Sequence, residues 1–510
     1  MKINQTLIAI TLFNISILQA QQTFSSKLLD ANTKQPIAFA TIQFNSKTGV
    51  ISNDNGEFNI TIKRAIKASD SLVINCLGYE EKRIALLDFY KPTIYLNSKT
   101  VDLSEVLVTN KNYTIDEILD NIKKGFTLNY DFSYTQRKLF FRESYYNNVD
   151  KSDVNLEKST IPEINQQLID SLLQIMPKNT NDHTEILAEL YGEIDPEKLQ
   201  KMEILKACHL YDESTDINLD NYEKRFNEIF KKYVKRDSYF KIKSGWFSVK
   251  EEIDPSLFGD EIEKKHVATE TLLAEQKKKD SIREMGFLQW KKTAIHQFEN
   301  NNFIDEDSDL NFIHKSRRYD FEIEDYTYIK DLFVYVITFK PKRSEDFAGT
   351  MYVNTEDFAV VRVDYKNIKQ LSQFSLLGIS IKEYLKEGTI IFQKNENKKY
   401  TLKYRGETTG QQVGIKRPIK IVEKNKNVRG RLKQNELKGN IHFIVRSVDK
   451  TELIVFDTNS LTESDFKKFK EKTLITPTKL NQYDPEFWKG YNIIEPNQAI
   501  KEFKTIASED

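Results

Sequence analysis

Hydrophobic and polar residues alternate along two short stretches near the start of the chain, residues 37–44 and 57–62. A period of two is typical of β-strands that bury one face. Between the stretches lies the oxygen-rich run Asn53–Glu57, which could form a tight turn or bind calcium. Asn55 and Gly56 tolerate positive φ, whereas the twelve-residue spacing and the flanking helices of a calcium loop are missing from the sequence. The pattern therefore favours a β-hairpin turn.

A helical period replaces this alternation over residues 114–128. Apolar residues recur there at intervals of three and four, and Thr114 and Glu117 have the spacing of a capping box. This pattern predicts an amphipathic helix that packs on another element. Residues 138–149 then read as a strand, so residues 111–150 should form the start of a second domain.

Residues 151–300 are charged and poor in glycine. Their apolar residues recur mostly at helical spacing, most clearly over 159–176, 195–211, 221–234 and 261–298. We therefore expect a mainly helical insertion across 151–300.

Residues 301–460 contain strands separated by short polar turns, which is typical of an antiparallel meander. The strand at 333–339 is largely apolar on both faces, so both faces of the sheet should be covered. The helix at 114–128 could cover one face, and the helical insertion or a ligand the other. A fully covered sheet, which we expect, would indicate a rigid scaffold for partners, and an open apolar face would indicate a carrier. Residues 461–510 form a C-terminal extension.

Several motifs in residues 21–110 occur in the order found in one known domain. They are Pro36-Ile37, Ala40-Thr41-Ile42, Gly49, Asn53, Gly56-x-Phe58, Leu77-Gly78-Tyr79 and Leu103-x-Glu105-Val106. This stretch resembles the carboxypeptidase regulatory-like domain. The resemblance implies a small transthyretin-like β-sandwich, common in exported and outer-membrane proteins of Gram-negative bacteria. It implies no peptidase, because in zinc carboxypeptidases such a module follows a separate catalytic domain.

Through the pattern of residues 335–365, the C-terminal part of the chain resembles exported curved-sheet proteins of the lipoprotein-carrier type, whose half-barrel holds apolar ligands. The predicted fold is therefore multidomain: an N-terminal all-β sandwich, then an α+β domain with an antiparallel curved sheet and a helical insertion. The order of the modules also resembles the front half of larger outer-membrane proteins that continue into a transmembrane barrel. Residues 461–510 are too few for such a barrel, so we expect outer-membrane association without one.

Residues 1–20 combine Lys2 with an apolar run that ends at Ala20, which is typical of a signal peptide. An uncleaved anchor is the alternative. The protein should therefore be exported, to the periplasm or to the outer membrane. The two cysteines, Cys76 and Cys208, fall in different predicted domains and should be buried free thiols.

Charge and motifs indicate binding rather than catalysis. Lys+Arg and Asp+Glu both number 76, which argues against a nucleic-acid partner. No nucleophile or phosphate-loop motif is present. His296 and Glu299 fit the H-x-x-E spacing of zinc carboxypeptidases, with His442 as a conceivable third ligand, but we interpret them as a surface pair at a helix end. The basic stretch 424–440 could contact phosphates or lipid head groups, and a solvated hairpin is the simpler interpretation.

The three tryptophans, Trp246, Trp290 and Trp488, should be core anchors. We assign no catalytic, cofactor or metal residues and expect no cofactor. The predicted function is an exported, non-enzymatic protein that binds an envelope protein or an apolar ligand. An envelope hydrolase of the peptidase kind and an apolar-ligand carrier are the alternatives.

Overall fold

The computed structural model describes residues 21–45, 49–90, 92–99, 113–195, 197–211, 220–235, 238–245, 247–252, 286–330, 332–426, 433–472 and 475–504. The predicted signal peptide, the motif at Leu103–Val106, Trp246 and part of the basic stretch 424–440 lie outside these residues.

The N-terminal domain consists of two small β-sheets. One has the order β4-β1-β7 and the other the order β3-β2-β5-β6. Their strands are β1 (Gln22–Asp30), β2 (Thr41–Phe44), β3 (Gly49–Ile51), β4 (Glu57–Ile62), β5 (Ser71–Asn75), β6 (Lys82–Ala85) and β7 (Thr93–Leu96). The 3-10 helix η2 (Leu86–Asp88) follows β6. Leu28, Ile42 and Phe58 are buried together in one apolar cluster, as the alternating pattern predicts for a sandwich.

The turn at residues 53–56 is present, but it does not close a hairpin. Gly56 has a φ of 75°, and its amide donates to the carbonyl of Asn53 at 2.9 Å. The strand before the turn, β3, pairs with β2, whereas the strand after it, β4, pairs with β1. The turn therefore carries the chain from one sheet of the sandwich to the other.

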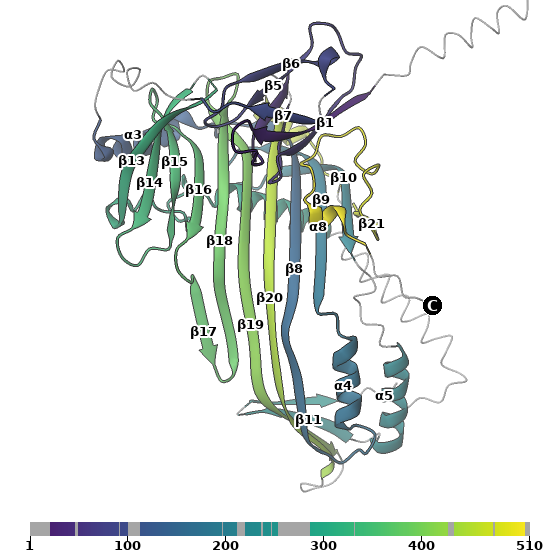
Figure 1. Ribbon diagram of the computed structural model, residues 1–510. Coiled ribbons are helices and arrows are strands. Elements are labelled where there is room, and N and C mark those ends of the chain that lie inside the picture. Colours follow the sequence, from purple (N-terminus) through teal and green to yellow (C-terminus); the bar gives the residue numbers. More distant parts are fainter. Residues whose placement is uncertain are drawn as a thin grey trace, which may run out of the picture.

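The second part of the chain is one sheet of 14 strands (Figure 1). Its main path is β13-β14-β15-β16-β18-β19-β20-β8-β9-β10-β21. The strands are β8 (Thr135–Ser159), β9 (Asn179–Gly192), β10 (Lys201–Tyr211), β11 (Ser238–Ser244), β12 (Phe247–Glu252), β13 (Tyr319–Ile329), β14 (Leu332–Pro341), β15 (Phe347–Asn354), β16 (Val360–Asn367), β17 (Ser372–Leu376), β18 (Ile379–Lys394), β19 (Tyr400–Asn425), β20 (Lys433–Ser460) and β21 (Thr478–Leu480). Strands β8, β19 and β20 have 25, 26 and 28 residues, so they extend well beyond their neighbours.

The helices lie near the two ends of the long strands. Figure 1 shows α3 and the sandwich near one end and α4 and α5 near the other. The named helices are α3 (Ile115–Asn129), α4 (Gln166–Ile175), α5 (Asp220–Tyr233), η5 (Ser316–Arg318), α7 (Glu463–Lys468) and α8 (Gln498–Lys501), and residues 286–300 are also helical. The capping box of α3 is present as predicted, with Thr114 and Glu117 bonded reciprocally. Among the described helices, none is both long and apolar enough to cross a membrane.

Close to the sandwich, the large sheet is covered on both faces. On one face, α3 and residues 286–313 pack against the strands, in a cluster that includes Phe126, Ile295 and Leu453. On the other face the cover is the sandwich together with residues 483–503, in a cluster that includes Phe140 and Ile454. The strand pattern suggests the insertion or a ligand as the cover of this second face. The sandwich and residues 483–503 cover it instead.

The prediction of a mainly helical insertion is wrong for most of the described residues between 151 and 252. Helices α4 and α5 are present, but residues 179–192 and 201–211 are the sheet strands β9 and β10, and residues 238–252 hold the hairpin β11-β12. A β-bulge explains part of the error. Leu205 has no register partner on β9, so apolar residues after it change face and mimic a helical interval.

Candidate binding sites

An apolar patch lies on the long strands, away from the sandwich. Two rows of directly paired residues cross neighbouring strands there. The first row is Phe374, Ile381, Val413, Val445 and Val149, and the second is Leu376, Ile379, Ile415 and Phe443. Because directly opposed residues of antiparallel strands share a face, all of these side chains lie on one face. We call these residues the apolar patch.

The apolar patch is not part of a described hydrophobic core. Phe374 and Leu376 are 50% and 56% exposed, and the remaining members are half-buried. None belongs to a buried cluster of the described residues. A contiguous apolar surface of this kind is typical of a binding site.

A polar belt separates the patch from the core under α3. Along the same face, Tyr145 pairs with Asp449, and Asp449 pairs with Thr409. Glu143 forms an ion pair with Lys291 of the helix at 286–300 and accepts a hydrogen bond from Tyr145. Burial, and then the nearby charge of Glu143, raise the pKa of Asp449. The patch is therefore a separate surface rather than an edge of the core.

On the side of the patch that lies away from α3, helices α4 and α5 cover the long strands. Leu168 of α4 and Ile229 of α5 are buried together, with Leu437 of β20 packed against them. The patch thus lies between two helical layers on the same long strands. The sequence predicts several of these strands. Which of their side chains meet in the patch depends on the register between the strands, which the sequence does not show.

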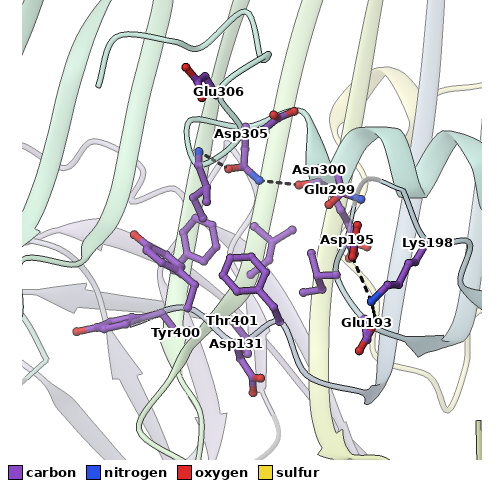
Figure 2. Close-up of a pocket in the computed structure, with 17 residues that line it drawn as sticks. Asp131, Glu193, Asp195, Lys198, Glu299, Asn300, Asp305, Glu306, Tyr400 and Thr401 are labelled. Atoms are coloured by element: carbon purple, nitrogen blue, oxygen red, sulfur yellow. Dashed lines mark hydrogen bonds and ion pairs between the residues drawn. The ribbon is translucent and has the colours of Figure 1, made fainter. Parts of the chain in front are cut away.

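A second site is an acid-lined cavity of about 460 Å³ beside α3 (Figure 2). Six carboxylates and one lysine line it: Asp131, Glu193, Asp195, Glu299, Asp305, Glu306 and Lys198. Lys198 is bonded to Glu193 at 2.5 Å and lies 3.4 Å from Asp195. Glu299 is 2% exposed and forms an ion pair with Arg137 at 2.5 Å. The net negative lining suits a cationic group.

His296 and Glu299 are not the surface pair that we expected. Both are buried, because the helix at 286–300 lies against the sheet, where Arg137 meets Glu299. His442 lies on β20, opposite Lys416 and Asp153. Among the residues that the structure describes, no group of three or more His, Cys, Asp or Glu could hold a metal ion.

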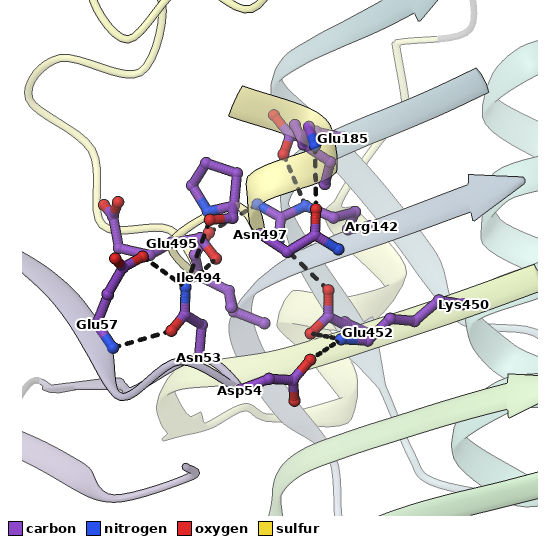
Figure 3. A network of polar contacts seen from close by, with 12 residues as sticks. Asn53, Asp54, Glu57, Arg142, Glu185, Lys450, Glu452, Ile494, Glu495 and Asn497 are labelled. Carbon is purple, nitrogen blue, oxygen red and sulfur yellow. Dashed lines mark hydrogen bonds and ion pairs between the residues drawn. The ribbon is translucent and has the colours of Figure 1, made fainter. Parts of the chain in front are cut away.

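A buried polar network joins the sandwich to the sheet (Figure 3). Arg142 of β8 donates to Glu185 at 2.7 Å, to Glu452 at 3.3 Å and to the carbonyl of Ile494 at 2.6 Å. Lys450 contacts Glu452 and also Asp54 of the sandwich turn. Burial alone would lower the pKa of Arg142, but Glu185 and Glu452 hold it above its ordinary value.

The acidic turn contributes further contacts to this junction. Asn53 Oδ1 accepts from the amides of Asn55 and Glu57 at 3.0 and 2.9 Å. Glu57 accepts from Lys501 at 2.7 Å. The turn oxygens therefore bind backbone amides and lysines, and residues 483–503, read from sequence only as an extension, hold the sandwich on the sheet.

The cysteines are buried free thiols, as predicted. Cys76 comes from the sandwich and Cys208 from β10, and both belong to the cluster at the junction. Burial raises the pKa of the Cys76 thiol to about 11. Of the tryptophans, Trp488 is a core anchor that donates to Glu185 at 2.6 Å, whereas Trp290 is 59% exposed, contrary to prediction.

Comparison with known proteins places one part of the chain in a family. Two solved structures show low similarity: the crystal structure of MucB in complex with MucA(peri), with 7% identity over 66% of this chain and 94% of that chain and a TM-score of 0.15, and the complex structure of Pseudomonas aeruginosa MucA/MucB, with 5% identity over 64% and 92% and a TM-score of 0.13. Likeness at this level supports no conclusion about function. No curated protein matches the chain. Residues 24–108 match the CarboxypepD_reg-like domain, the family to which the motif order assigned this β-sandwich.

Proposed function

We propose that this chain is an exported, non-enzymatic binding protein of the cell envelope that holds an elongated apolar ligand on the apolar patch. The observation that supports this proposal is the pair of apolar rows across β17, β18, β19, β20 and β8. These rows lie outside every described core cluster. This proposal favours the carrier over the rigid scaffold.

The backbone under the patch favours a ligand that needs no hydrogen bonds. Strands β18, β19 and β20 each have a paired strand on both sides, so their amides and carbonyls are already used. An extended peptide laid across them would leave its own backbone polar groups unpaired, which is costly in an apolar contact. A hydrocarbon chain has no such groups.

The extent of the patch also suits a chain-like ligand. Five strands at about 4.8 Å spacing give a width of about 19 Å from β17 to β8. Helical layers bound the patch at both ends along the strands. We therefore propose a long acyl chain as the occupant.

Export rests on the sequence pattern of residues 1–20, with the periplasm or the outer membrane as the destination. We expect protein recovered from the envelope to begin at about residue 21. Mass spectrometry of the N-terminal peptide measures this. An intact N-terminus would instead identify the apolar run as an anchor.

The test of ligand binding compares two neighbouring substitutions on β19. Val413→Glu places a charge in the first row of the patch, whereas Gln412→Glu places one on the opposite face, beside Lys382 and Arg446. The mature protein should bind a fluorescent long-chain fatty acid saturably. Val413→Glu should weaken this binding at least tenfold, because a carboxylate would be desolvated by the ligand, and Gln412→Glu should leave it within about twofold.

Absence of saturable binding to the native protein would refute the carrier. Equal losses in both variants would place the ligand elsewhere. If circular dichroism shows that Val413→Glu does not fold, Val413→Thr replaces it. This change keeps the shape of the side chain and puts a hydroxyl in place of a methyl group, so the expected loss of binding is about threefold.

A further inference from the structure

A cavity of about 240 Å³ lies where the sandwich meets the large sheet. The sandwich contributes residues of β2 and β5, including Gln43 and Asn75, and the sheet contributes residues of β13, β14, β16, β18 and β19. The volume equals the share of roughly eight water molecules in the liquid, enough for a small organic molecule. The cavity is on the opposite face of the sheet from the apolar patch, because it lies under the sandwich.

Most of the lining is apolar, and one amide in it has no partner. Leu332, Val361 and Ile391 are part of the lining. Asn75 is 9% exposed, and within the described structure neither its side-chain nitrogen nor its oxygen has a hydrogen-bond partner. Buried amides are normally paired, so an unpaired one in a cavity indicates a missing polar group.

The charged residues that line the cavity, among those described, are all basic: Lys330, Arg362, Lys394 and Lys403. Asp364 neutralises Arg362 at 2.8 Å, and Asp357 neutralises Lys394 at 2.9 Å. Lys403 is 6% exposed and donates to the carbonyl of Val455 at 2.8 Å, and no described carboxylate is within ion-pair distance of it. Burial lowers its pKa to about 8, opposed by the charge of Asp457.

Backbone strain is present at the same place. Phe39 lines the cavity with a φ of 59°, in the left-handed region that bulky residues rarely adopt. Its ring packs against Tyr404 of β19, with centroids 5.0 Å apart. Strain of this kind persists where surrounding contacts enforce it, often beside a ligand.

From the unpaired Asn75, the basic lining and the strained Phe39, we propose that the junction cavity binds a small aliphatic carboxylate. The hydrocarbon chain lies among Leu332, Val361 and Ile391. The carboxylate accepts hydrogen bonds from Lys403 Nζ and Asn75 Nδ2, which gives the lysine an anionic partner and the amide nitrogen an acceptor. The ligand contacts both parts of the chain and so stabilises their docking.

Octanoate is the probe, measured on the mature full chain by calorimetry. Lys403→Met keeps most of the length of the side chain and removes its charge, and it should weaken octanoate binding at least tenfold. Binding of 1-octanol, which has the same chain and no charge, should change less than twofold in this variant. Lys472→Met, at a lysine whose side chain is 77% exposed, is the matched control and should bind both probes like the native protein.

The native protein gives a second readout that needs no variant at the site. Cys76 lines the cavity and Cys208 does not. Octanoate should slow modification of Cys76 by a small thiol reagent at least fivefold, followed by mass spectrometry of the two cysteine peptides, and leave Cys208 unaffected.

Failure of octanoate to bind, or binding without protection of Cys76, would overturn the proposal. Equal weakening of octanoate and octanol by Lys403→Met would overturn the role of the carboxylate. The apolar patch is tested separately, because Val413→Glu should leave octanoate binding unchanged. If the native protein binds octanoate but shows no saturable binding of the long-chain fatty acid, the proposed function alone is refuted.

Discussion

Substitution of Arg142 by methionine is expected to lower the free energy of unfolding by about 3–5 kcal/mol. Arg142 is 1% exposed and contacts Glu185, Glu452 and the carbonyl of Ile494. Methionine fills much of the space but leaves the two carboxylates buried without their main cation. Denaturant unfolding of the native protein and the variant at pH 7 measures the loss.

The loss should shrink as the pH falls. In the native protein burial favours the neutral form of Glu452, but Lys450 and Arg142 hold its pKa below the ordinary value. A depressed folded-state pKa gives stability above the unfolded-state pKa that disappears as the pH falls through the folded-state value. In the variant, protonation of Glu185 and Glu452 removes the uncompensated charge instead. The difference in unfolding free energy between the two proteins therefore becomes smaller as the pH falls.

Arg446→Met is the matched control. Arg446 lies on β20 and pairs with Asp150 at 2.5 Å, but its side chain is 50% exposed. A solvated ion pair of this kind contributes about 0–1 kcal/mol. Similar losses in Arg142→Met and Arg446→Met would contradict a structural role for the buried network.

Substitution of Gly56 by valine is expected to destabilise the protein by at least about 2 kcal/mol. Gly56 has a φ of 75°, which β-branched residues strongly disfavour. A Cβ at this position would also run into the carbonyl oxygen of Leu28. Leu28 cannot easily move away from this Cβ, because its amide donates a hydrogen bond to the carbonyl of Gly56 at 2.8 Å. Thermal unfolding followed by circular dichroism measures the effect.

Two further variants separate the causes. Asn55→Ala changes the adjacent turn residue, which has no positive φ, and should cost less than about 0.5 kcal/mol. Gly56→Asn tolerates the backbone conformation but keeps the clash with Leu28, so its effect should fall between the other two. If Gly56→Val is as stable as Asn55→Ala, the turn geometry is not what the sandwich requires.

The sequence was most informative where a local rule decides the structure. The capping box fixes the start of α3 at Thr114, because the bonds run between residues three apart. Asn55-Gly56 predicts a turn through local backbone preference alone. The prediction that this turn closes a hairpin was wrong, because the partner of β3 is β2 and that of β4 is β1, a choice made by packing.

The strands β9 and β10 were missed for a physical reason as well. On β10, Met202 and Ile204 face the core under α3, and after the bulge at Leu205 the buried Cys208 faces the junction. Burial on both faces and the extra residue remove the period of two. The charged residues of this region also include buried ion-paired groups such as Glu185.

The sequence by itself determined the β-sandwich family of residues 24–108, the capped helix, the antiparallel strands after residue 310 and the two buried thiols. These depend on motifs, local hydrogen bonds and periodicity, which a sequence displays directly. Only the tertiary structure decided that residues 483–503 hold the sandwich on the sheet, that Arg142 joins Glu185 to Glu452, and that Val413 and Val445 share an apolar face. Each of these depends on strand register and on contacts between distant residues, which a shift of one position would reverse.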